Sequence, residues 1–216
     1  MAISDAVGAL DHDMREMFGG RLRSVVVYAV TDRTPDAPQP TLVIVDALTP
    51  KDLRACAALV LKWHESGLAT PLLLEASEFE RSLDAFPYEF GAILADHMIV
   101  SGENPFDGLR VDPEDMRRAC EIQARSHLLH LREGYIETQG RSDAIAELIR
   151  RSAAPLSALL RSVARLKGAS PAEGVLAQVA GLNGKELSAE AARRLFPDYL
   201  SAIEYLTSEI DRWGRV

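Results

Sequence analysis

Five acidic residues lie in or beside the predicted strands in the first half of the chain, namely Asp32, Asp36, Asp46, Glu89 and Asp96. Carboxylates are preferred ligands of Mg²⁺, and two bound Mg²⁺ ions can activate a hydroxyl and stabilise a leaving pyrophosphate. That chemistry requires at least two of these carboxylates within about 4–6 Å of each other. Glu89 is the best acid candidate among them, but we favour structural roles for Asp32, Asp36, Asp46 and Glu89, because acidic side chains commonly form local hydrogen bonds at turns, caps and bends.

A second candidate pair, Arg125 and His130, lies in the second half of the chain. A histidine can act as a general base near neutral pH, and an arginine can stabilise a phosphorane. The spacing resembles the active pair of helical-bundle ribonucleases, in which a tyrosine stands two residues after the histidine. Because Arg132 occupies that position here, we favour a surface or packing role for the pair.

The first half of the chain is predicted to alternate helices and strands. Apolar residues at helical spacing predict a helix over 3–18, and Thr49 with Pro50 predicts the start of a helix that ends near Ser66. The capping-box pattern of Ser77 and Glu80 predicts a further short helix. Runs rich in β-branched and apolar residues predict strands over 22–30, 41–45, 71–75, 90–94 and 98–100.

The second half is predicted to be entirely helical. Helices are expected over 113–138, 142–167, 171–181, 188–195 and 198–213, with Pro155 kinking or splitting the second. Each carries an apolar stripe beside alternating charges, as a helical bundle requires. The predicted fold class is α+β, with a small mixed β-sheet domain over 1–108 followed by an all-α helical bundle domain over 109–216.

Composition narrows the classes of partner. The 216-residue chain is 47% hydrophobic, which is enough to bury a sizeable core, and its net charge of −8 argues against broad binding to nucleic acid or to anionic membranes. The lack of a signal pattern and of a long apolar run predicts a cytoplasmic protein. Cys56 and Cys120 are expected to be buried free thiols. A homodimer through Trp63, Trp213 or Tyr205 is left open.

The strand over Ser24–Val30, the proline-rich loop and the strand over Thr41–Val45 resemble the core of nucleotidyltransferases of the polymerase-β type. In that family the first strand ends in Gly-Ser, which approaches the nucleotide phosphates, and the second strand opens with Asp-x-Asp, which binds Mg²⁺. Ala29 and Val30 match the first motif, and Pro38 and Pro40 match the second. Further similarity to a bacterial group of nucleotidyltransferase-like proteins lies in 42–53, 71–75, 82–90, 97–105 and 131–135.

The resemblance implies a nucleotidyltransferase-like domain with a helical C-terminal domain, in which the catalytic signature is replaced. It therefore implies a degenerate member that binds a nucleotide or a protein partner in the inter-domain cleft. The alternatives are an active, divergent nucleotidyltransferase, which would need Mg²⁺ and an NTP, and the ribonuclease described above. Tyr28, Thr31 and Arg33 are the candidates for contacting a nucleotide, and Asp46, Glu89 and Asp96 are the remaining catalytic candidates, with no metal site predicted.

Overall fold

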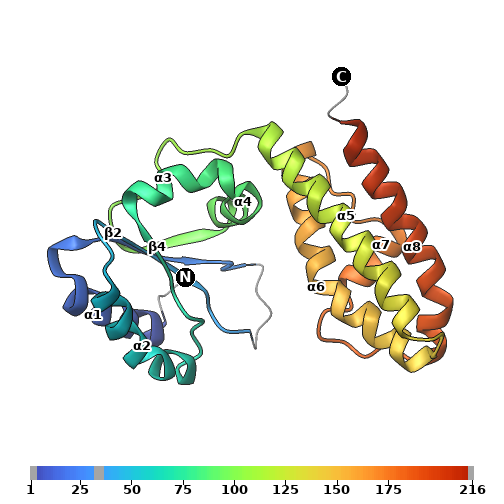
Figure 1. The fold of residues 1–216 in the computed structure, drawn as a ribbon, viewed down its shortest axis with the longest axis horizontal. Helices are drawn as coiled ribbons and strands as arrows, with labels where there is room; N and C mark the ends of the chain where they lie inside the picture. The colour runs from blue at the N-terminus through green and yellow to red at the C-terminus, as the bar shows by residue number, and fades with distance from the viewer. Residues whose placement is uncertain (1–3, 32–36, 214–216) are drawn as a thin grey trace. The chain divides into compact units, whose positions relative to one another are not determined.

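The computed structural model describes residues 4–31 and 37–213. The chain divides into two compact units, 1–111 and 112–216, whereas the sequence prediction placed the boundary after residue 108. The first unit contains all the strands of the described residues, and the second contains only helices (Figure 1). The fold is therefore α+β, a small mixed-sheet domain followed by an all-helical domain, as predicted.

A mixed four-stranded sheet forms the centre of the α/β unit, with strand order β3-β2-β1-β4. Its strands are β1 (Leu22–Tyr28), β2 (Thr41–Val45), β3 (Leu72–Glu75) and β4 (His97–Gly102). β1 pairs antiparallel with both β2 and β4, whereas β2 pairs parallel with β3. The end of β1 therefore lies beside the starts of β2 and β4, and the start of β1 lies beside their ends.

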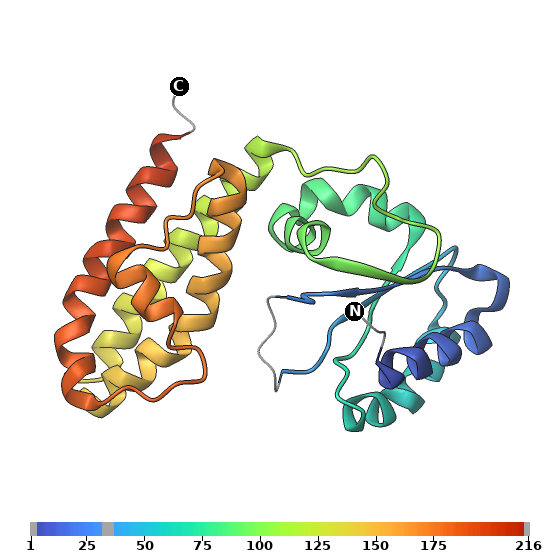
Figure 2. The same cartoon turned by 180° about the vertical axis from the view of Figure 1, so that it is seen from behind.

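Helices cover both faces of this sheet. On one face α1 (Asp5–Phe18) and α2 (Pro50–Glu65) pack against Val25, Val27 and Val43, with Trp63 fully buried between them. On the other face α3 (Ala76–Ala85) and α4 (Pro87–Ala95) form a second core with Val26, Leu42 and Ile44. Figures 1 and 2 show the two helix pairs on opposite sides of the sheet. Because both faces are covered, every residue of β2 is buried.

Two predictions in the α/β unit are wrong in detail. Residues 90–94 form part of helix α4 and not a strand, because Pro87 occupies the first helical turn and the apolar run continues the helix. A short apolar run has no periodicity that separates a strand from a buried helix. The capping box of α3 is made by Glu75 and Glu78, two residues before the predicted pair. The predicted cap of α2 by Thr49 is confirmed, and Asp52 completes a capping box there.

The helical unit consists of α5 (Pro113–Glu137), α6 (Ser142–Lys167), α7 (Gly174–Ala180) and α8 (Ala189–Arg212). The predicted break between 195 and 198 is wrong, because α8 runs continuously through Pro197. Proline removes one backbone hydrogen bond from a helix interior. Buried Leu195, Phe196 and Tyr199 on both sides of Pro197 hold the two parts in one helix. Pro155 is likewise interior to α6, which the structure assigns as one helix.

Both cysteines, Cys56 and Cys120, are buried and free, as predicted. Burial raises the pKa of the Cys120 thiol to about 11, so the thiol stays protonated at neutral pH. Within the described residues, no helix is long and apolar enough to cross a membrane.

Candidate functional site

The turn after β1, where the family motif would supply Gly-Ser, is held by Asp96. The Ala29 N–H donates to the backbone oxygen of Asp96 over 2.9 Å. The Thr31 N–H and Oγ1 donate to Oδ2 of the same residue over 2.9 and 3.0 Å. Ala29 has a φ of +52°, a left-handed conformation that glycine adopts readily and alanine does not. The turn thus keeps a backbone shape suited to glycine while carrying a Cβ.

The segment before β2, where the family motif would supply Asp-x-Asp, is tied to its neighbours through Gln39. The Gln39 N–H donates to the Gly67 oxygen over 2.8 Å, and its side-chain amide donates to the Tyr28 oxygen over 2.8 Å. Pro38 and Pro40 flank this residue and offer neither a carboxylate nor a backbone donor. Tyr28 is partly buried, and burial raises the pKa of its hydroxyl.

Asp46 lies at the far end of the sheet from this turn. Its backbone N–H donates to the Arg21 oxygen, and its Oδ1 accepts from Arg23 Nε over 2.5 Å. Asp96 precedes β4 beside the opposite end of β1. At about 3.3 Å per residue, the seven-residue strand β1 separates Asp46 from Asp96 by roughly 20 Å. These two carboxylates cannot share a metal ion.

Glu89 is exposed in the first turn of α4, and Asp96 caps the other end of that helix. Seven residues of helix separate the two backbones by about 10 Å. The structure therefore does not bring together the three catalytic candidates that it describes. Asp32, Arg33 and Asp36 lie outside the described residues. Among the residues described, no three His, Cys, Asp or Glu side chains form a group that could hold a metal ion.

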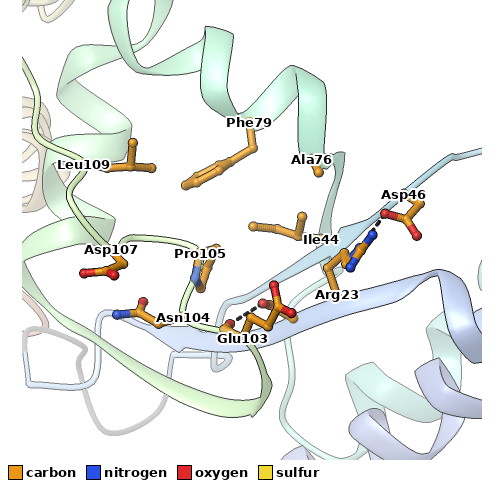
Figure 3. A pocket seen from close by; sticks show the side chains of 11 residues that line it. Arg23, Ile44, Asp46, Ala76, Phe79, Glu103, Asn104, Pro105, Asp107 and Leu109 are labelled. Carbon is orange, nitrogen blue, oxygen red and sulfur yellow. Dashed lines mark hydrogen bonds and ion pairs between the residues drawn. The ribbon is translucent and has the colours of Figure 1, made fainter.

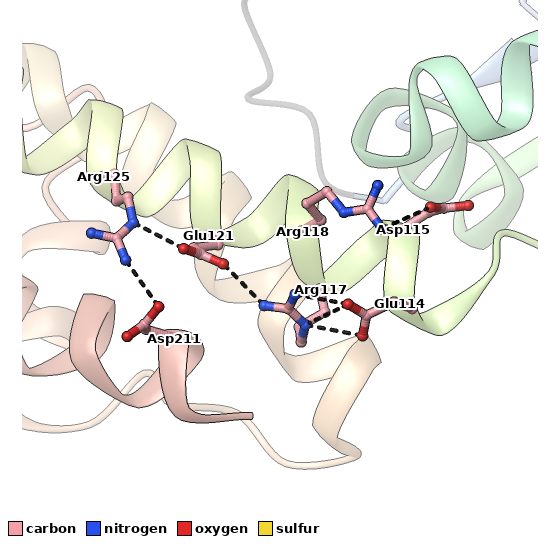
Figure 4. Close-up of polar contacts among 7 residues, drawn as sticks. All are labelled: Glu114, Asp115, Arg117, Arg118, Glu121, Arg125 and Asp211. Carbon is pink, nitrogen blue, oxygen red and sulfur yellow. Dashed lines mark hydrogen bonds and ion pairs between the residues drawn. The ribbon is translucent and has the colours of Figure 1, made fainter. Parts of the chain in front are cut away.

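Arg125, one member of the candidate ribonuclease pair, is engaged in ion pairs (Figure 4). Its Nε donates to Glu121 and its Nη2 to Asp211, both over 3.0 Å. Glu121 also accepts from Arg117, which in turn binds Glu114. This arrangement connects α5 to α8 and gives Arg125 a structural role within the helical unit.

Two features of the structure were not predicted from the sequence. The first is a cavity of about 330 Å³ at the start of β1, whose walls come from four separate segments and so leave no local pattern (Figure 3). The second is a chain of hydrogen bonds in the helical unit, in which His127 contacts Tyr199 and Tyr199 donates to Ser152. His127 stands only three residues before the predicted His130, but the apolar stripe of α5 does not reveal its partner on α8.

Comparison with known proteins identifies the fold. Neither a scan against protein-family models nor a search of curated proteins found a match. Among solved structures, the chain is similar to a spectinomycin adenyltransferase from Enterococcus faecialis, determined with ATP and spectinomycin. The TM-score is 0.51 at 10% sequence identity, and the match covers 93% of this chain and 98% of the other. At this identity the likeness establishes a shared fold across both units.

Proposed function

We propose that this protein keeps the nucleotidyltransferase fold without transferring nucleotides, and that it acts by binding a nucleotide or a protein partner. One observation carries the proposal: Oδ2 of Asp96 accepts hydrogen bonds from the backbone N–H and Oγ1 of Thr31. A donor engaged in this way is free for a phosphate only after the carboxylate moves. A carboxylate fixed at this turn also repels a phosphate electrostatically.

The residues at the two motif positions support the same interpretation. The Ala29 Cβ narrows the approach that a glycine would leave open to phosphate oxygens. Val30 offers no hydroxyl. Pro38 and Pro40 supply no oxygen ligand from their side chains, so Mg²⁺ would need carboxylates from elsewhere.

The alternative proposal is an active, divergent nucleotidyltransferase. It is favoured by the shared fold with an adenyltransferase that was determined with ATP and spectinomycin. It requires two or more carboxylates at one place, and the separate positions of Asp46, Glu89 and Asp96 weigh against it. Fold alone does not decide between the proposals, because one fold commonly supports several functions.

A transfer assay separates the two proposals. The pure protein is incubated with each of four α-labelled NTPs, with Mg²⁺ or Mn²⁺, and with spectinomycin or a pool of small alcohols as acceptors. We expect no label on the protein or on any acceptor. Metal-dependent labelling that is lost in Asp96→Asn would overturn our proposal and establish Asp96 as part of an active site.

A binding assay tests whether the protein binds a nucleotide without transferring it. Thermal unfolding is followed with each NTP, with and without Mg²⁺, for the wild type and for Asp96→Asn. A ligand at a hundred times its dissociation constant stabilises the folded state by about 2.7 kcal/mol. If the carboxylate of Asp96 opposes phosphate, the variant should bind more tightly than the wild type, whereas Glu89→Gln should not change binding. If no NTP changes the melting temperature of either protein, nucleotide binding is excluded and binding of a protein partner is the remaining proposal.

A further inference from the structure

The cavity at the start of β1 has a floor of apolar side chains and an open, charged rim. Its floor contains Ile44 from β2, Phe79 from α3, and Pro105 and Leu109 from the segment after β4. Ile44 and Phe79 are each only 3% exposed and belong to the core of that sheet face. At about 330 Å³ the cavity lies at the lower end of the range for small-molecule sites.

Gly102 sets the position of the cavity wall that is formed by the segment after β4. It ends β4 with a φ of +85°, and a Cβ built on it would lie 1.9 Å from the Arg23 oxygen. Only glycine fits this approach, which turns the chain from the strand across the face covered by α3. The Ser24 hydroxyl then donates to the Glu103 oxygen over 2.5 Å, and the Glu103 N–H donates to the Arg23 oxygen over 3.1 Å. These contacts fix the wall against β1.

The rim carries more negative than positive charge. Three carboxylates, those of Asp46, Glu103 and Asp107, stand around it with a single cation, Arg23. Arg23 is paired with Asp46 through Nε and Oδ1. Glu103 also interacts electrostatically with Arg23, although beyond ion-pair distance. Asp107 makes no side-chain hydrogen bond or ion pair with any residue that the structure describes, and both carboxylates are exposed. Figure 3 shows Arg23 and Asp46 at one side of the apolar floor and Asp107 at the other.

We propose that this cavity binds a small organic amine, with the apolar body of the ligand on Phe79 and Ile44 and its ammonium group at Glu103 or Asp107. An excess of two carboxylates favours a cation over a neutral or anionic ligand, and the apolar floor favours an organic body over a bare metal ion. The site lies at the end of the sheet opposite the turn at Ala29. The proposal therefore does not rest on nucleotide binding.

Phenethylamine is the probe, because its ring matches the apolar floor and its amine is charged at neutral pH. Phenethyl alcohol is the neutral comparison, and phenylacetate is the anionic one. Binding to the full chain is measured by calorimetry, and the site is located from NMR shifts of the backbone amides of residues 103, 104 and 106–109. We expect the amine to bind most tightly, and raising the salt concentration to weaken its binding.

Charge-removing variants test the rim. Glu103→Gln and Asp107→Asn keep the side-chain shape, and at least one should weaken amine binding about three- to fivefold, as expected for an exposed charge pair. Asp84→Asn removes an exposed charge on α3 outside the cavity and should leave affinity unchanged. Ala76→Leu adds bulk to the wall and should block binding, with the melting temperature of the free variant reporting on its fold.

Three outcomes would overturn the inference. The first is equal affinity for phenethyl alcohol and phenethylamine, because charge would then play no part. The second is tighter binding of phenylacetate, which would assign the rim to Arg23 as an anion site. The third is the absence of any amine binding at millimolar concentration in a wild-type protein that is folded by NMR.

Discussion

Protonation of His127 should destabilise the helical unit, and the hydrogen bonds around it define how. Ser152 Oγ donates to the Ile149 oxygen over 2.7 Å, so it accepts from the Tyr199 hydroxyl over 3.0 Å. Tyr199 has then used its only proton, and His127 Nε2 must donate to it over 2.6 Å. The neutral ring therefore carries its proton on Nε2, and Nδ1 is the atom that would be protonated at low pH.

The size of the effect follows from the pKa. Burial between α5 and α8, with a smaller contribution from His130, lowers the pKa of His127 from 6.5 to about 4. The unfolded chain binds this proton near pH 6.5, and the folded chain only near pH 4. The stabilisation by neutral His127 is therefore complete above about pH 6.5 and is lost as the pH falls through the interval to 4. Between pH 8 and pH 5 the expected loss is about 2 kcal/mol of unfolding free energy.

Urea unfolding at a series of pH values, followed by far-UV circular dichroism, measures this loss. The matched variant is His127→Gln, whose side-chain amide can still donate to Tyr199 but does not titrate. The wild type should lose about 2 kcal/mol more than the variant between pH 8 and pH 5, and the imidazole NMR signals of His127 should not titrate above about pH 5. Parallel stability curves for the two proteins, or titration of His127 near 6.5, would refute the reasoning.

Three further substitutions have outcomes set by local structure. Thr41→Val should raise the unfolding free energy of the α/β unit by about 1 kcal/mol in urea unfolding, because the fully buried Thr41 hydroxyl has no hydrogen-bond partner among the described residues. Thr41→Ser, which keeps the hydroxyl, is the comparison and should give no such gain. Ala29→Gly should raise stability by about 0.5–1 kcal/mol in the same assay by relieving a positive φ, and a loss would contradict the assigned strain. Asp13→Ala should lower the unfolding free energy by about 1–3 kcal/mol, because the buried indole N–H of Trp63 donates to Asp13 over 2.9 Å and would lose its acceptor. The control is Asp5→Ala on the same helix, which should lower the unfolding free energy much less.

Local signals predicted most of the fold. Thr49 and Pro50 mark the start of α2 because capping is decided within one helical turn. The prediction failed where the deciding contacts are distant in sequence. Pro197 marks a helix break by local rules, yet the buried side chains around it keep α8 continuous. The apolar run over 90–94 is by itself compatible with both a strand and a buried helix, and it is helical because Pro87 starts α4 and the run packs against the sheet.

The candidate site was less predictable than the fold for the same reason. Asp96 was identified as a carboxylate beside a strand, but its contact with Thr31 spans 65 residues. That contact exists only because β4 pairs with β1 and places residue 96 against the turn at Ala29. The cavity at the start of β1 is assembled from four segments in the same way. Sequence supplied the residue types, and the strand order decided which of them meet.

The division between fold and site also explains how a shared fold survives at 10% identity. The cores that stabilise the α/β unit lie along the middle of β1 and β2, where Val25, Val26 and Val43 are completely buried. The motif positions lie beyond the ends of these strands. Ala29, Pro38 and Pro40 belong to neither core, and Val30 packs against one core while only partly buried. Substitutions there can therefore remove metal and phosphate ligands with little loss of folding free energy. The same separation would allow a second site, such as the cavity at the opposite end of the sheet, to arise without disturbing the strands between them.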